Sequence, residues 1–94
     1  MAAGGAGKVL VVDDEPDAVE FVKTMLEDVG YEVCCASDGV EGLATAREEA
    51  PDLVILDVQM PEKDGFSTFG DMRSEPELSD IPVIMLTGVG DRTG

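Results

Sequence analysis

The stretch that most constrains the fold is residues 52–65, DLVILDVQMPEKDG. In it, a run of four apolar residues from Leu53 to Leu56 ends abruptly at Asp57, with a proline nearby on either side. A run this short cannot form a buried helix, and it is typical of a strand covered on both faces, as in a parallel sheet. Asp57 would then lie at the carboxyl end of that strand, where open α/β sheets bind their ligands.

The rest of the chain alternates between short apolar runs and stretches with helical periodicity. The runs predict strands at residues 8–12, 31–36, 53–57 and 81–86. Apolar spacing and end signals predict three helices, one that begins at Pro16 and stops at Gly30, one from Asp38 to about Glu49, and one marked by Phe66, Phe69 and Met72. The order β-α-β-α-β-α-β with short connections predicts a parallel sheet with right-handed crossovers and helices on both faces.

Single residues add detail to these helices. In the first helix, Phe21 widens the apolar stripe. Asp38, followed three residues later by Glu41, resembles a capping box at the start of the second helix. Gly70 in the middle of the third weakens that helix by roughly 1 kcal/mol relative to alanine.

The composition is that of one small, acidic domain of 94 residues. Its 21 acidic residues against 6 basic ones give a net charge of −15. This charge repels phosphates and anionic lipid, so we expect no direct nucleic-acid binding and no membrane partner. A high-salt habitat or a missing basic C-terminal piece would each account for the excess of acid. The apolar runs are too short to span a membrane and the glycine-rich start lacks a signal peptide's apolar core, so we expect a cytoplasmic protein.

Two residue types further limit the chemistry. Histidine is absent, which removes the commonest general base and most zinc sites. Cys34 and Cys35 are adjacent and lack the spacing of a metal site. We expect two reduced thiols that face opposite sides of a strand.

Polar side chains collect where the predicted strands end. Asp13 and Asp14 follow the first strand, Asp57 ends the third, and Thr87 follows the fourth. If the first and third strands are neighbours, three carboxylates converge, which is unfavourable unless a cation neutralises them. An all-oxygen ligand set favours a hard ion, and a loosely built site that keeps water suits Mg²⁺. The alternative is that these aspartates only cap strand ends and start helices.

Three segments carry a resemblance to a known family: VVDDEP at residues 11–16, LDVQMPEKDG at 56–65 and PVIMLTG at 82–88. In this order and spacing, over essentially the whole chain, they resemble the receiver domain of two-component response regulators. The resemblance implies an α/β fold, a flavodoxin-like doubly wound parallel sheet with strand order 2-1-3-4-5. Residues 8–94 would form the receiver domain, after a flexible N-terminal segment at residues 1–7.

The same resemblance implies that the domain is incomplete at its C-terminus. Receivers carry a fifth strand that ends in a phosphate-pairing lysine, an aromatic switch residue and two further helices. Lys8 and Lys63 are both placed wrongly for that lysine. Apolar side chains left uncovered by the last helix would forfeit roughly 5–10 kcal/mol. We therefore predict a marginal monomer that self-associates or exchanges elements with a second copy.

The resemblance also implies a role for each site residue. Asp57 would be the nucleophile that takes a phosphoryl group from a phosphohistidine of a sensor histidine kinase or phosphotransfer protein. Asp13, Asp14 and Asp57 would hold Mg²⁺, with the backbone carbonyl of Val58 as a further ligand. Such a chain is a phosphoacceptor signalling domain and not an enzyme, since it promotes only its own phosphotransfer and dephosphorylation.

Two more residues would act once the phosphoryl group is in place. Thr87 would hydrogen-bond a phosphoryl oxygen and shift its loop, which switches the surface for a downstream output. Gln59 would lie over the site and influence how fast water removes the phosphate.

Other functions are weighed against this one. A receiver-like docking module that is never phosphorylated is the main alternative. A phosphatase of the haloacid-dehalogenase type would need a second aspartate where Gln59 stands. The sequence GAGK at residues 5–8 precedes its strand, so its position does not fit a phosphate-binding loop.

Overall fold

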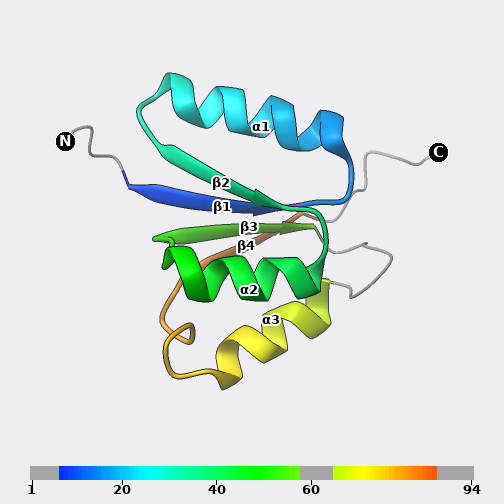
Figure 1. The fold of residues 1–94 in the computed structure, drawn as a ribbon, viewed down its shortest axis with the longest axis vertical. Helices are drawn as coiled ribbons and strands as arrows, with labels where there is room; N and C mark the ends of the chain where they lie inside the picture. The colour runs from blue at the N-terminus through cyan, green and yellow to red at the C-terminus, as the bar shows by residue number, and fades with distance from the viewer. Residues whose placement is uncertain (1–6, 58–64, 87–94) are drawn as a thin grey trace.

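Strands and helices alternate along the chain as the apolar runs predict (Figure 1). The computed structural model describes residues 7–57 and 65–86. Its elements are β1 (Lys8–Val12), α1 (Pro16–Asp28), β2 (Glu32–Ala36), α2 (Gly39–Glu49), β3 (Leu53–Asp57), α3 (Gly65–Ser74) and β4 (Val83–Leu86).

The strands form one parallel sheet in the order β2-β1-β3-β4. Val12, the last residue of β1, is level with Ala36 of β2 and with Leu56 of β3. The carboxyl ends of these three strands therefore meet at one edge of the sheet. The predicted α/β fold is confirmed, with the first four positions of the order 2-1-3-4-5 present in the part of the chain that is described.

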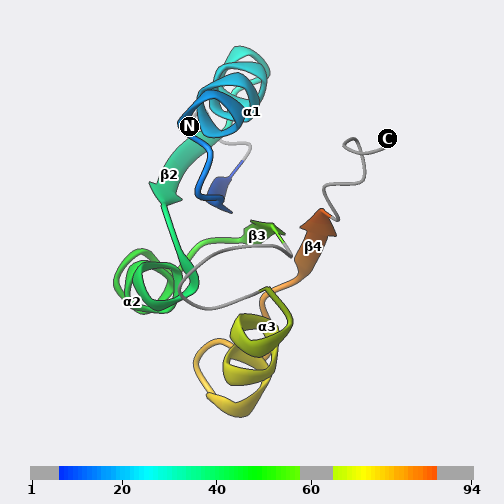
Figure 2. The same ribbon diagram turned by 90° about the vertical axis from the view of Figure 1, so that its right-hand side faces the viewer.

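Helices cover both faces of the sheet. α1 lies on one face, over β1 and β2, while α2 and α3 lie on the other (Figures 1 and 2). β1 is buried from Val9 to Val12 because it has a strand on each side and helices on each face. The core on the side of α2 and α3 consists of large buried apolar residues together with two alanines: Leu10, Val12, Ala36, Leu43, Ala46, Val54, Leu56, Met72 and Leu78.

The start of α2 shows the predicted capping interactions. Asp38 Oδ1 accepts a hydrogen bond from the Glu41 N–H at 2.8 Å. The Glu41 carboxylate reaches back and accepts from the Ser37 N–H and the Ser37 hydroxyl, both at 2.8 Å. In a standard capping box, the acidic side chain accepts from the backbone N–H of the cap residue, which is Asp38 here. In this chain Glu41 accepts instead from Ser37, one residue earlier. These bonds satisfy backbone groups at the helix start and hold the end of β2 to α2.

Two strand ends differ from the sequence prediction. Tyr31 lies outside β2, because its N–H donates to the Leu26 carbonyl at 3.1 Å and closes the end of α1. β4 begins at Val83 and not at Ile81. The reason is that Pro82 has no N–H with which to continue the ladder.

The prediction that Phe21 widens the buried stripe of α1 is wrong. Val22 and Leu26 are half-buried, whereas Phe21 is 66% exposed, because α1 rests on the sheet through a narrow face only. On the same face of the sheet, Ile84 and Leu86 of β4 are 49% and 41% exposed. No helix in the described part of the chain covers them (Figure 2).

The apolar residues of α3 do not all face the core either. Met72 is buried and Phe69 packs against the core cluster, whereas Phe66 is 66% exposed. Residues 66 and 72 lie about 120° apart around a helix of 3.6 residues per turn, so both cannot face one core.

Cys34 and Cys35 are both free thiols, as predicted. Cys34 is half-buried and Cys35 is exposed, on opposite faces of β2 as successive strand residues must be. Burial raises the pKa of both thiols. None of the helices in the described residues has the length and apolar content that a membrane span requires.

Two helix glycines provide a matched test of the packing. A methyl group at Gly70 would meet no atom within 4 Å, whereas one at Gly42 would lie 3.1 Å from both methyl groups of the buried Val12. Gly70→Ala is therefore expected to raise the free energy of unfolding by about 1 kcal/mol. Gly42→Ala should gain less or lose stability, since Val12 must shift. Urea denaturation measures both changes, and equal gains would contradict the close packing of α2 on β1.

A second prediction concerns the cap of α2. Asp38→Ala should lower the free energy of unfolding by about 1 kcal/mol, because the Glu41 N–H loses its acceptor. Asp38→Asn keeps a side-chain oxygen in the same place and is expected to cost much less. Thermal denaturation of the two variants checks this, and an asparagine as harmful as the alanine would show that the hydrogen bond is not what stabilises the helix start.

Candidate functional site

Three aspartates meet at the carboxyl edge of the sheet. Asp13 follows β1 directly and Asp57 is the last residue of β3, and the register between these strands brings the two positions side by side. One carboxylate oxygen from each of Asp13, Asp14 and Asp57 lies within 4.8 Å of the others. The convergence that the sequence predicts for neighbouring first and third strands is therefore present.

The backbone around Asp13 places its side chain. The Asp13 N–H donates to the Ala36 carbonyl at 3.1 Å and so extends the pairing of β1 with β2 by one residue. Asp13 Oδ1 accepts from the Glu15 N–H at 3.0 Å, which closes the turn before α1. Asp13 and Asp57 are half-buried, whereas Asp14 is exposed. Two of the carboxylates thus have strand-end positions and the third faces solvent.

Negative charge dominates this edge. The basic side chains in the described part of the chain are engaged elsewhere, and the first of them, Lys8, lies at the opposite end of β1. Their partners are Glu49 and Glu32 for Lys8, Glu27 for Lys23, Glu75 for Arg47, and the carbonyl oxygens of Ser79 and Ile81 for Arg73. Among the described residues, these basic groups thus pair at other places on the molecule, and a cation at the cluster would reduce the repulsion among the three aspartates.

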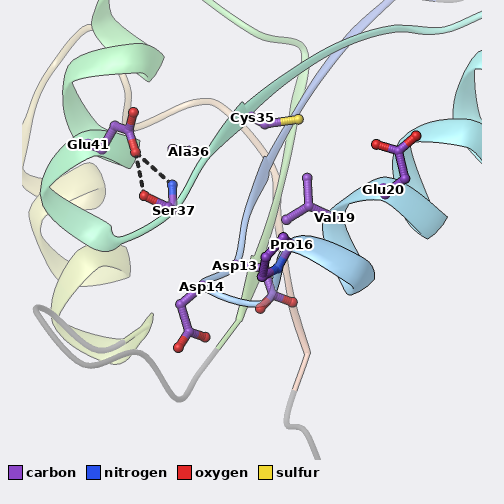
Figure 3. Close-up of a pocket in the computed structure, with 9 residues that line it drawn as sticks. All are labelled: Asp13, Asp14, Pro16, Val19, Glu20, Cys35, Ala36, Ser37 and Glu41. Atoms are coloured by element: carbon purple, nitrogen blue, oxygen red, sulfur yellow. Dashed lines mark hydrogen bonds between the residues drawn. The ribbon is translucent and has the colours of Figure 1, made fainter.

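An open depression of about 390 Å³ lies beside Asp13 and Asp14, between the start of α1, the end of β2 and the start of α2 (Figure 3). The residues that line it are Asp13, Asp14, Pro16, Val19, Glu20, Cys35, Ala36, Ser37 and Glu41. The hydrogen bonds from Ser37 lower the pKa of the Glu41 carboxyl. The site thus joins a carboxylate cluster to a space that water and small ligands can enter.

Sequence reasoning identified part of this site only. Val58, Gln59 and Thr87 lie outside the described residues, so their roles stay predictions. Glu20, Ser37 and Glu41 line the depression but were not among the predicted site residues. For Ser37 and Glu41 a signal existed, since they flank the predicted helix cap at Asp38, directly after a strand.

The carboxylate cluster fits a hard divalent cation. Its donor atoms are all oxygens, they come from the ends of two strands, and one of the three side chains is exposed. Magnesium prefers one or two carboxylates together with several retained waters, which such an open site can accommodate.

Comparison with known proteins gives the family. The chain matches the response regulator receiver domain over residues 9–93. It is 48% identical over 84 residues to the "Probable transcriptional regulator ycf27" of Pyropia yezoensis. The aligned residues make up 89% of this chain and 33% of that protein. The chain thus spans about a third of the length of this curated relative.

Solved structures agree with this match. The N-terminal domain of a response regulator receiver protein from Methanoculleus marisnigri JR1 superposes with a TM-score of 0.87 at 42% identity, covering 89% of this chain and 68% of that one. The receiver domain of the sensor histidine kinase PA1611 from Pseudomonas aeruginosa PAO1 gives a TM-score of 0.85 at 27% identity, covering 92% and 70%. That domain has a magnesium ion coordinated in its active site cleft. With the sheet order and the family match together, the chain belongs to the response regulator receiver domains, the signalling domains of two-component systems.

Proposed function

We propose that this chain accepts a phosphoryl group on Asp57 from a phosphohistidine of a sensor histidine kinase or phosphotransfer protein, with Mg²⁺ as cofactor. The observation that carries the proposal is the approach of Asp13, Asp14 and Asp57 to within 4.8 Å of one another. In a receiver domain, such a cluster at the carboxyl edge of the sheet combines a nucleophile with cation ligands. The finding of magnesium in the active site cleft of the PA1611 receiver domain supports the choice of ion.

In the proposed reaction, a carboxylate oxygen of Asp57 attacks phosphorus. The new O–P bond replaces the P–N bond of phosphohistidine, and the imidazole nitrogen leaves with the electron pair. Asp57 suits this role because β3 pairs with a strand on each side, which positions its backbone, while its side chain stays half-exposed. The chain performs one transfer onto itself and is thus an acceptor instead of an enzyme acting on many substrates.

The cation ligands in this proposal are Asp13, Asp14, Asp57 and the backbone carbonyl of Val58. When bound, Mg²⁺ offsets the negative charge of the carboxylates and of the transferred phosphoryl oxygens. The hydrogen bond from the Glu15 N–H holds one oxygen of Asp13 in place. Asp14 is exposed, so its carboxylate would be available to a cation that enters from solvent.

The same proposal includes two residues outside the described part of the chain. Thr87 hydrogen-bonds a phosphoryl oxygen and shifts its loop, so that a local charge becomes a changed surface for a downstream output. Gln59 influences how fast water removes the phosphate. Both assignments rest on the family resemblance of their motifs.

Magnesium binding has a stability signature. Without Mg²⁺, Asp14→Asn is expected to raise the melting temperature, because it removes one of three like charges that lie close together. Mg²⁺ at roughly 100 times its Kd should stabilise the wild-type chain by about 2.7 kcal/mol, and Asp14→Asn should lose most of this gain. Differential scanning calorimetry with and without the ion measures both effects.

The control for this experiment is Asp28→Asn. Asp28 ends α1, away from the start of that helix beside the cluster, so its removal changes net charge equally and leaves the site intact. A chain whose melting temperature does not respond to Mg²⁺ would contradict the cation site.

Beryllofluoride tests the acceptor directly, because it mimics a phosphoryl group bound to a carboxylate. We expect it to bind in the presence of Mg²⁺ and to lose detectable binding on Asp57→Asn, with Asp28→Asn behaving as the wild type. Fluorine-19 NMR reports the bound species. A chain that binds Mg²⁺ but not beryllofluoride would instead be a docking module that is never phosphorylated.

A further inference from the structure

A group of apolar side chains lies open to solvent on the face of the sheet that α1 covers in part. We call it the apolar corner and define it as Phe21, Met25, Ile55, Ile84 and Leu86. Phe21 and Met25 are 66% and 51% exposed, and Ile84 and Leu86 are 49% and 41% exposed. Ile55 is half-buried. Large apolar side chains gathered at one place on a protein surface are typical of an interaction site.

The floor of the corner comes from two neighbouring strands. Val83 and Met85 of β4 pack against the core cluster on the side of α2 and α3. The alternate residues, Ile84 and Leu86, therefore point to the other face. Ile55 of β3 is level with Ile84 and lies on the same face. Because α1 lies over β1 and β2, no helix of the described residues lies above this floor (Figure 2).

The wall of the corner is one flank of α1. Lys23 lies on the flank toward β2, since it interacts electrostatically with Cys35 of that strand. Residues two positions apart are separated by about 200° around a helix, so Phe21 and Met25 both lie on the flank opposite Lys23. In the strand order β2-β1-β3-β4, the side away from β2 is the side of β3 and β4. The wall thus faces the space above the floor.

We propose that the apolar corner is a dimerisation surface, on which a second copy of this chain packs with two-fold symmetry. In this arrangement the β3–β4 face of one copy lies on the same face of its partner, about 10 Å away, as in packed sheets. An α-helix is about as thick, roughly 10–12 Å, so α1 of each copy stands beside the partner's β4 and closes the interface with its apolar flank. The inference is independent of the proposed phosphoacceptor function.

The area of the corner is sufficient for a second copy. A large side chain such as phenylalanine offers about 150–250 Å², and four side chains that are each about half exposed give roughly 400 Å² per copy. Two-fold symmetry doubles this to about 800 Å², because both copies use the same patch. Homodimer interfaces are about 65% apolar, so the total is near 1,200 Å², the lower end for specific interfaces. Such an area suits a dimer of micromolar affinity.

Charge determines how this dimer responds to salt. The corner itself contains no charged residue, whereas each copy carries a net charge of −15. Two copies therefore repel one another at long range, and salt screens that repulsion. Association of two copies should strengthen as salt is added. Binding of a basic partner to the same acidic chain would weaken instead.

Sedimentation equilibrium of the full chain tests the proposal. We expect mainly monomer at about 1 μM and mainly dimer at about 100 μM, in line with a micromolar Kd. The Kd should fall several-fold between about 0.01 M and 1 M salt, as the Debye length shortens from about 30 Å to about 3 Å.

Two phenylalanines provide a matched pair of variants. Phe21 lies in the corner and Phe66 lies on α3, across the sheet, and both are 66% exposed. Phe21→Gln should raise the dimer Kd by about tenfold or more, because the two-fold axis removes the side chain from the interface twice. Phe66→Gln should leave the Kd unchanged. Ile84→Thr keeps a β-branched residue that suits a strand, and it provides a second test in the same direction if Phe21→Gln folds poorly.

The outcomes separate a second copy from other occupants. A chain that stays monomeric at about 100 μM in 1 M salt would overturn the proposal and leave the corner to a different protein or segment. A dimer that neither Phe21→Gln nor Ile84→Thr weakens, or that Phe66→Gln weakens equally, would also overturn it, because the contact would then lie elsewhere.

Discussion

The parallel pairing of β1 with β3 is the constraint on which the rest of the structure depends. It aligns Val12 with Leu56 and so brings the residues that follow, Asp13 and Asp57, to one edge of the sheet. The pairing persists because both strands are inner strands with buried apolar residues, Val9 to Val12 in β1 and Val54 and Leu56 in β3, of which Leu10 and Val54 are completely inaccessible. Burial of such side chains contributes roughly 1.5–3 kcal/mol each. The hydrophobic core thereby holds together charges that would otherwise separate.

This arrangement is a balance between two opposing energies. Three carboxylates within 4.8 Å of one another repel, and the described lysines and arginines have partners elsewhere. Core burial is large and insensitive to what binds at the edge, whereas the repulsion disappears once positive charge arrives. A cation bound between the three carboxylates would reduce this repulsion.

Much of the fold follows from local sequence patterns, because a strand, a helix start or a helix cap depends mainly on residues that are close together in the sequence. The run at residues 53–56, the proline at the start of α1 and the Asp38 cap all predicted elements that are present. Errors arose where a tertiary contact decides the outcome. Phe21 matches the apolar spacing of α1 yet is exposed, because periodicity cannot tell how wide a face the sheet offers. The return bond of Glu41 to Ser37 likewise depends on how β2 leads into α2.

The sequence by itself determined the types of element, their order, and the acidic character of the strand ends, because these depend on spacing along the chain. It also carried the motifs that identify the receiver family. Spacing along the chain left open whether β1 and β3 are neighbours, and only the family resemblance implied it. The tertiary structure decided that they are, and hence that Asp13, Asp14 and Asp57 meet. Only the structure placed Glu20 and Glu41 on opposite sides of one depression. The physical reason is that strand pairing and helix packing are set by burial summed over the whole core, which no local window of sequence contains.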